Sequence, residues 1–220
     1  GNNSTFTCRS VSSTGTDTYS AIAAAVGSLK GPKHGGANRQ VLAQFSLIKQ
    51  TVRDWKDDDA VADCVGRILR RELGDGSGLI YGMGHAVYTL SDPRTVILRQ
   101  SARTLAAQRG MLDELELMEA VERVTPRVFA EVTGHEKVMC ANVDMYSGLI
   151  YQMLDIPPDL FTPLFAVARI TGWCAHRMEE VLTGGRLYRP AYKSLTRHRE
   201  YIPMAARTYR KNPLPAEKRD

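Results

Sequence analysis

Apolar side chains recur at helical spacing along most of the chain. In residues 41–55, for example, Val41, Phe45, Ile48 and Val52 fall three or four positions apart, as they do on the buried face of an α-helix. No stretch shows the sustained alternation of apolar and polar residues that is typical of a half-buried strand. The pattern therefore predicts an all-α fold.

Capping and breaking residues locate the ends of the predicted helices. Asp17 is suited to cap the first helix, Asp92 followed by Pro93 the fourth, and Gly184 to end the last. Pro126 is expected to break or kink the fifth helix, because proline lacks the N–H that an interior turn needs. With these limits, the predicted helices cover residues 19–29, 41–55, 60–73, 93–109, 112–132 and 162–184.

Two histidines lie in glycine-rich stretches. His34 stands within residues 31–36, which hold three glycines, and His85 follows Gly84. A glycine-rich backbone permits close approach by a ligand, although the same composition also suits an ordinary turn. The spacing of a Walker phosphate loop is absent. Two such histidines in one short chain favour a role in binding or catalysis.

Arg94 and Asp144 each precede or begin an apolar helical stretch. An arginine in the first turn of a helix can bind an anion, but it can equally be a surface charge. Asp144 follows Asn142, and either residue can cap the next helix. The alternative is that Asp144 acts as a general base. The residues themselves leave both questions open.

Arg169 is the most informative single residue in the sequence. It interrupts residues 164–175, which are otherwise apolar on nearly every side, as in a buried helix. An arginine cannot lose its charge there, and leaving it unpaired would cost several kcal/mol. Arg169 therefore requires an anion, which is either a structural carboxylate or the carboxylate of a substrate.

Composition and charge narrow the function classes. Hydrophobic residues make up 43% and charged residues 24% of the chain, and no apolar run approaches the ~20 residues of a membrane-spanning helix. The net charge is +5, but residues 186–220 carry ten Lys/Arg against three Asp/Glu. This basic arm favours solvation or small anions over nucleic acid. The four scattered cysteines predict neither a metal site nor disulfides and suit a reducing cytoplasm.

Several stretches together resemble the citrate synthase family, in the same order and with similar spacing from Gly1 to about Lys193. The opening Asn3-Ser4-Thr5-Phe6 is similar to the family's NxSTF segment. The other matches are GPKHGGAN to GPxHGGAN, YGMGHAVY with DPR to GxGHxVY and DPR, ANVDMYSG to PNVDxYSG, LFTPLFAVARITGWCAH to FTxxFAxARxxGWxAH, and RLYRP to RIxRP.

The resemblance implies the condensation of acetyl-CoA with oxaloacetate to citrate and coenzyme A. It assigns Asp144 as the base that takes a proton from the acyl α-carbon, while His34 hydrogen-bonds the thioester oxygen. It assigns His85 to polarise the carbonyl group of oxaloacetate. No metal and no permanently bound cofactor are implied, because the coenzyme A thioester is a substrate.

The resemblance also implies binding residues for both substrates. Arg94, Arg169 and Arg189 would hold the carboxylates of oxaloacetate, with Arg189 supplied across the interface of a homodimer. Gly84 and Asn142 would belong to the coenzyme A site. Neither a membrane nor a nucleic acid is an expected partner.

The expected organisation is a small acyl-CoA-binding domain at residues 37–150. Two pieces of the large helical domain, residues 1–36 and 151–220, would flank it, and the second would end in an arm. The family carries a histidine that contacts oxaloacetate and would fall two residues before Gly1. The chain by itself is therefore expected to be an inactive fragment of the enzyme.

Three departures from the family pattern keep alternatives open. Met83 and Met145 replace commoner aromatic residues, and Ala86 stands where many relatives have arginine. These changes bear on the shape of the acyl pocket and on contacts with coenzyme A. The alternatives are a 2-methylcitrate synthase that uses propionyl-CoA, and a non-catalytic piece that folds and associates without turnover.

Overall fold

The computed structural model describes residues 2–85, 88, 90–136, 138–191, 193, 195 and 200–207, and its regular structure is helical. The predicted all-α class is confirmed, because the only extended pairing among these residues is an isolated bridge between Met83 and Ala141. None of their helices is long and apolar enough to cross a membrane. The elements are α1 (Asn3–Ser12), α2 (Thr18–Leu29), α3 (Ala37–Thr51), α4 (Asp58–Leu69), α5 (Pro93–Arg109), α6 (Leu112–Thr133), α7 (Asp144–Met153), η1 (Pro158–Leu160), α8 (Phe161–Thr183) and η2 (Met204–Ala206).

The chain divides into two compact units, Gly1–Leu187 and Tyr188–Asp220. The first contains helices α1 to α8. The second contains η2, and most of its described residues are exposed.

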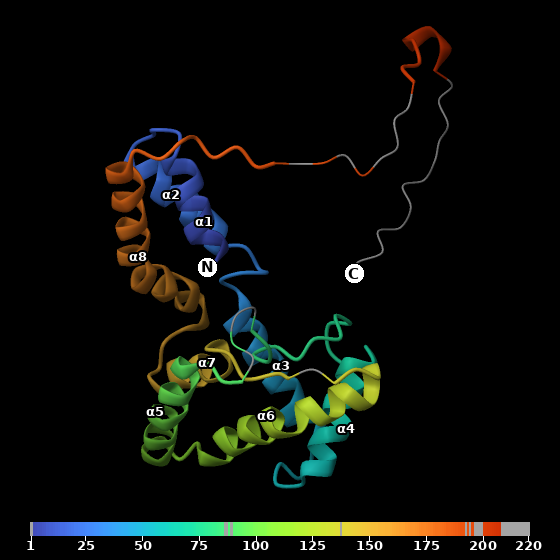
Figure 1. The fold of residues 1–220 in the computed structure, drawn as a ribbon. Coiled ribbons are helices and arrows are strands. Elements are labelled where there is room, and N and C mark those ends of the chain that lie inside the picture. Colours follow the sequence, from blue (N-terminus) through green and yellow to red (C-terminus); the bar gives the residue numbers. More distant parts are fainter. Residues whose placement is uncertain are drawn as a thin grey trace. The chain divides into compact units, whose positions relative to one another are not determined.

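The first unit contains two separate hydrophobic clusters. One joins α1, α2 and α8 through the buried residues Cys8, Ala21, Ala25, Leu29 and Trp173. Figure 1 shows α1 and α2 beside α8, although these helices come from opposite ends of the unit. The thiol of Cys8 donates a hydrogen bond to the carbonyl of Trp173 at 3.7 Å. This cluster is therefore built from contacts between residues far apart in the sequence.

The other cluster lies among α3, α4, α5, α6 and α7 (Figure 1). Its fully buried members include Leu115, Met145 and Tyr146. All of its buried residues fall between Val41 and Met153. The segment expected to form the small domain, residues 37–150, contains all of them except the last.

Local signals placed several helix ends correctly. The carboxylates of Asp17 and Asp92 cap α2 and α5 by accepting hydrogen bonds from backbone N–H groups of the first turn. Gly110 and Gly184 end α5 and α8 in the left-handed conformation, with φ of 69° and 61°. These positions were predictable because each depends on only a few neighbouring residues.

Pro126 does not break α6, so of the expected break or kink the break is absent. The helix runs from Leu112 to Thr133 with Pro126 inside it. The neighbouring residues Val124, Thr125 and Val128 are buried in the core. Their burial offsets the one backbone hydrogen bond that proline removes, so packing overrides the local preference.

Other helix limits also differ from the sequence prediction. Helix α1 was not predicted, α3 ends at Thr51 rather than Trp55, and α4 ends at Leu69 rather than at residue 73. After α4, Arg71 has a φ of 67°, which takes the chain out of the helix. Apolar residues continue at helical spacing past the ends of α3 and α4. The reason is that Trp55 and Leu73 still pack against the core from outside these helices.

Candidate active site

His34 lies in the tight loop between α2 and α3. Its imidazole Nε2 accepts a hydrogen bond from the backbone N–H of Ser4 at 3.3 Å, so the neutral ring carries its proton on Nδ1. Burial and the positive charge of Arg169 lower the pKa of His34. At neutral pH the half-buried side chain is therefore an uncharged hydrogen-bond donor.

Gly35 closes the same loop against the end of α2. Its N–H donates to the carbonyl of Leu29 at 2.8 Å, and a Cβ on Gly35 would lie 2.3 Å from that oxygen. We therefore expect Gly35→Ala to open the loop and to lower the free energy of unfolding by about 2 kcal/mol. Urea denaturation measures this change.

Gly27→Ala is the matched control for that substitution. Gly27 lies inside α2, and a Cβ there would meet open space. Alanine is favoured over glycine in a helix by about 1 kcal/mol, so this variant should be as stable as the original chain or more so. Equal stability of the two variants would contradict the steric role given to Gly35.

Ser4 connects His34 to helix α8. Its buried hydroxyl accepts hydrogen bonds from Nε1 of Trp173 at 3.3 Å and from Nη1 of Arg169 at 3.4 Å, and donates to Oδ1 of Asn2 at 2.8 Å. The residues alone gave Ser4 no role. A serine in the first turn of a helix is common, and its partners on α8 are 165 and 169 positions away. Only the fold brings them together.

Arg169 extends from α8 toward other charged groups of the site. Its guanidinium stacks on the ring of Phe165, 4.3 Å from the centroid. Within the described part of the chain, no carboxylate lies within ion-pair distance of Arg169. Burial and the charge of Arg94 lower the pKa of Arg169, while Asp144 opposes them. The structural carboxylate considered for Arg169 is therefore absent from the described residues, and the positive charge faces the site.

Two loops pair to place Asn142 beside Gly84. The N–H of Gly84 donates to the carbonyl of Cys140, and the N–H of Asn142 donates to the carbonyl of Gly82, both at 2.8 Å. The amide Nδ2 of Asn142 donates to the carbonyl of Gly84 at 2.9 Å, and its Oδ1 accepts the N–H of Asp144 at 3.0 Å. The side chain of Asn142 thus satisfies the N–H of the first residue of α7 and leaves the carboxylate of Asp144 available. Binding of coenzyme A by Gly84 and Asn142 stays a prediction.

Asp144 is the first residue of α7 and is partly buried. Burial raises the pKa of its carboxyl group to about 6, although Arg94 and Arg169 act in the opposite direction. A carboxylate with this pKa is ionised at neutral pH and is more basic than an ordinary aspartate. Both properties suit a general base.

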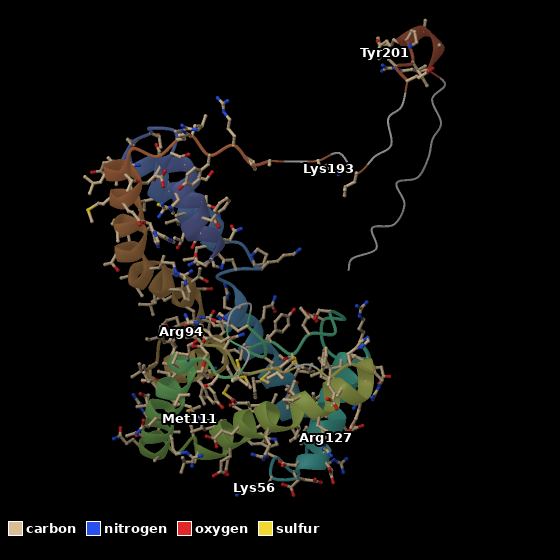
Figure 2. The ribbon with its side chains drawn as sticks, viewed as in Figure 1. Lys56, Arg94, Met111, Arg127, Lys193 and Tyr201 are labelled. Carbon is tan, nitrogen blue, oxygen red and sulfur yellow. The ribbon has the colours of Figure 1, made fainter. Side chains whose placement is uncertain are left out.

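Arg94 is fixed at the start of α5, where Figure 2 shows it. The buried carboxylate of Asp92 accepts hydrogen bonds from its Nε at 3.0 Å and its Nη2 at 2.7 Å. The same Nη2 lies 3.4 Å from Nε2 of His85. Nδ1 of His85 accepts the backbone N–H of Tyr88 at 3.1 Å. Arg94 is therefore an oriented cation beside the ring of His85.

Five of the six predicted catalytic and oxaloacetate-binding residues form one connected cluster. Electrostatic interactions join Asp144 to Arg94 and Arg169, and Arg169 to His34. His85 joins the cluster through its contact with Arg94. The arrangement combines a base of raised pKa, two cations and two histidines, of which His34 is an uncharged N–H donor. It can bind a carboxylate and move a proton close by.

Arg189 is the predicted residue outside this cluster. It belongs to the second unit and its side chain is exposed, so its role stays a prediction. Ala86 lies outside the described residues. In the part of the chain that is described, no group of three or more His, Cys, Asp or Glu side chains has the arrangement of a metal site.

An open groove of about 640 Å³ between α5 and α6 contains none of the predicted site residues. Each of its arginines already contacts a carboxylate, whereas Arg169 in the cluster around Asp144 has none within ion-pair distance among the described residues. The groove is therefore a weaker candidate for anion binding. The groove is lined by Val96, Arg99, Gln100, Arg103, Glu119, Glu122 and Arg123.

The fold is all-helical in the described residues, and the cluster places a carboxyl group of raised pKa near two arginines. Comparison with known proteins specifies the family. The family model described as "Citrate synthase, C-terminal domain" matches residues 1–191. The chain belongs to the citrate synthase family, which confirms the resemblance seen in its motifs.

Individual relatives agree with this assignment. The citrate synthase of Synechocystis sp. is 42% identical over 209 residues, which cover 94% of this chain and 48% of that protein. The 2-methylcitrate synthase 1 of Corynebacterium glutamicum is 38% identical. The match covers 94% of this chain and 49% of that protein. The chain spans about half the length of the curated relatives it matches.

A solved structure shows the same relationship. It is the ternary complex of carboxymethyl coenzyme A and oxaloacetate with citrate synthase from Thermoplasma acidophilum. Its TM-score is 0.74 at 32% sequence identity, and the match covers 94% of this chain and 51% of that one.

Proposed function

We propose that the protein, in its complete form, condenses acetyl-CoA with oxaloacetate and water to give citrate and coenzyme A. The observation that carries the proposal is the position of Asp144, a carboxylate with a pKa of about 6, near two arginines. Family membership and the ternary complex of a relative support the same substrates.

Proton transfer is the first step. The carboxylate of Asp144 takes a proton from the α-carbon of the thioester, and the electron pair of the C–H bond moves toward the thioester oxygen. An ordinary carboxylate is too weak a base for this carbon acid unless the developing charge is stabilised. The Nδ1–H of His34 would donate to that oxygen. Its uncharged state is supported by the lowered pKa of His34.

Carbon–carbon bond formation is the second step. The enolate carbon attacks the carbonyl carbon of oxaloacetate, and the carbonyl oxygen takes a proton from Nε2 of His85. Water then hydrolyses the thioester, so that the acyl–sulfur bond breaks and coenzyme A leaves as the thiol. Arg94 and Arg169 would hold the carboxylates of oxaloacetate throughout.

Arg189 would complete the oxaloacetate site from a second copy of the protein. Under this proposal the complete enzyme is a homodimer, and each copy contributes its Arg189 to the other. Residues 37–150 would be the acyl-CoA-binding domain and would close over oxaloacetate before proton transfer, which excludes water. The separate hydrophobic clusters on the two sides of that boundary support a division there.

Condensation of propionyl-CoA to 2-methylcitrate is the second candidate. Relatives named 2-methylcitrate synthase match the chain at 38% and 36% identity. The same residues would serve both reactions, because the two acyl groups differ by one methyl group. An apolar pocket discriminates such a difference by only about 10–200-fold.

Release of the coenzyme A thiol tests the proposal. The complete protein is incubated with oxaloacetate and either acetyl-CoA or propionyl-CoA, and kcat/KM is measured for each. We expect oxaloacetate-dependent thiol release with both and a preference for acetyl-CoA. A preference for propionyl-CoA would assign the second function, and no release with either would refute both.

A further inference from the structure

Tyr146 links the helix that carries Asp144 to the core. It lies two residues after Asp144 on α7, so the two side chains point to different sides of the helix. Tyr146 is fully buried, and its hydroxyl donates a hydrogen bond to the carboxylate of Glu122 on α6. Burial and this hydrogen bond raise the pKa of Tyr146. The phenol therefore remains a donor at every pH at which the protein works.

Glu122 joins that helix to a third one. Its Oε2 accepts from Tyr146 and also lies 3.6 Å from Nη1 of Arg99 on α5. Arg99 stands five residues after Arg94 on the same helix. One carboxylate oxygen therefore contacts α5 and α7 close to the ends where Arg94 and Asp144 lie.

The contacts of Glu122 with Tyr146 and Arg99 lie where they can affect the distance between Asp144 and Arg94, because a helix tends to move as one unit. A slide or rotation of α7 against α5 would carry Asp144 with it and change its relation to Arg94. A misplacement of about 1 Å at a reacting group can reduce a rate by about a hundredfold. The three side chains restrain this movement within one helical turn of the start of α7 and within two turns of the start of α5.

We propose that Tyr146, Glu122 and Arg99 form a positioning network that holds the start of α7 against the start of α5. They do so without touching substrate, and through Asp144 they affect the rate of proton abstraction. The inference rests on the proposed function of Asp144 as the base.

A second ion pair between the same helices offers a comparison. Arg103 on α5 donates to Glu119 on α6 at 2.5 Å. This pair makes no hydrogen bond to α7 and interacts with Tyr146 only through its charges. If these ion pairs only stabilise the packing of α5 on α6, removing either pair should have the same effect. If the Arg99–Glu122 pair also positions Asp144, only the removal of Glu122 should change the rate of proton abstraction.

The test uses three variants of the complete protein. Tyr146→Phe removes one oxygen atom and little volume, Glu122→Gln removes the shared charge, and Glu119→Gln is the control. We expect the first two to lower kcat about tenfold, with KM for oxaloacetate within about twofold of wild type. Glu119→Gln should leave both constants unchanged.

The pKa of Asp144 can be measured without any catalytic activity and gives a second test. Carboxyl NMR of the 13C-labelled protein follows its pKa, which responds to burial and to the facing groups Arg94, Arg169 and Tyr151. Burial is the main cause of the raised pKa. Loosening the first turn of α7 admits water, so the pKa should fall toward the ordinary carboxyl range in Tyr146→Phe and stay unchanged in Glu119→Gln.

The outcomes separate this inference from the proposed function. If wild type has no condensation activity, the proposed function fails, and the titration alone then decides whether the network positions Asp144. If wild type is active but Tyr146→Phe keeps its kcat and the pKa of Asp144, the network is refuted. Equal effects of Glu119→Gln and Glu122→Gln would also refute it, because the contacts would then serve general stability.

Discussion

Asp144→Asn in the complete protein should lower the rate of α-proton abstraction by about three orders of magnitude, as expected for loss of a general base. Asparagine keeps the shape of the side chain but cannot accept the proton. Oxaloacetate should still bind, because Arg94 and Arg169 remain. The measurement is exchange of the methyl protons of acetyl-CoA with deuterated solvent. Wild-type exchange in this variant would show that another group is the base.

The pH dependence of stability provides a control for Asp144→Asn. The pKa of Asp144 is raised from 3.8 in the unfolded chain to about 6 in the folded protein. Between these values the folded state binds more protons, so this group makes stability fall as pH rises through the window. Asp144→Asn should therefore be at least as stable as wild type above about pH 6. Loss of exchange together with loss of stability there would point to misfolding instead.

Arg169→Leu should weaken oxaloacetate binding by about a hundredfold, because a desolvated carboxylate would lose its charged partner. Calorimetry on the complete protein measures this affinity. The pKa of His34 should rise in the same variant, since the charge of Arg169 lowers it in the native protein. Undiminished affinity for oxaloacetate would remove Arg169 from the substrate site.

Arg177→Leu is the matched control on the same helix. Arg177 donates hydrogen bonds to Thr18, Ser12 and Thr16, away from the charged cluster. Its replacement should lower the free energy of unfolding by about 1–3 kcal/mol and leave oxaloacetate affinity unchanged. Equal losses of affinity for oxaloacetate in Arg169→Leu and Arg177→Leu would mean that both changes disturb the structure of α8. The loss in Arg169→Leu would then be no evidence for a contact with the substrate.

The sequence predicted those features that depend on neighbouring residues or on a motif. The two ends of α5, the cap at Asp92 and the terminus at Gly110, follow from local rules. The cap fixes Arg94 in the first turn of the helix. The tautomer of His34 could not be predicted, because the backbone N–H of Ser4, 30 positions earlier, determines it.

Tertiary contacts account for what the sequence did not reveal. Nothing near Tyr146 indicates that its hydroxyl meets Glu122, 24 positions earlier. Pro126 indicated a break or kink because local rules do not include the packing of Val124 and Val128. The raised pKa of Asp144 likewise results from burial, which a sequence motif does not measure.

The long-range packing of α1 and α2 on α8 sets an order of events during translation. The α3–α7 cluster is continuous in sequence and can close once α7 has left the ribosome. The α1–α2 side of the other cluster can be buried only after α8 has been synthesised, and α8 begins more than a hundred residues after α2. This side includes Ala21, Ala25 and Leu29. At about 5–20 residues per second, this interval is roughly ten seconds. A nascent chain stopped before α8 would therefore keep the α3–α7 core and lack the partner that buries α1 and α2.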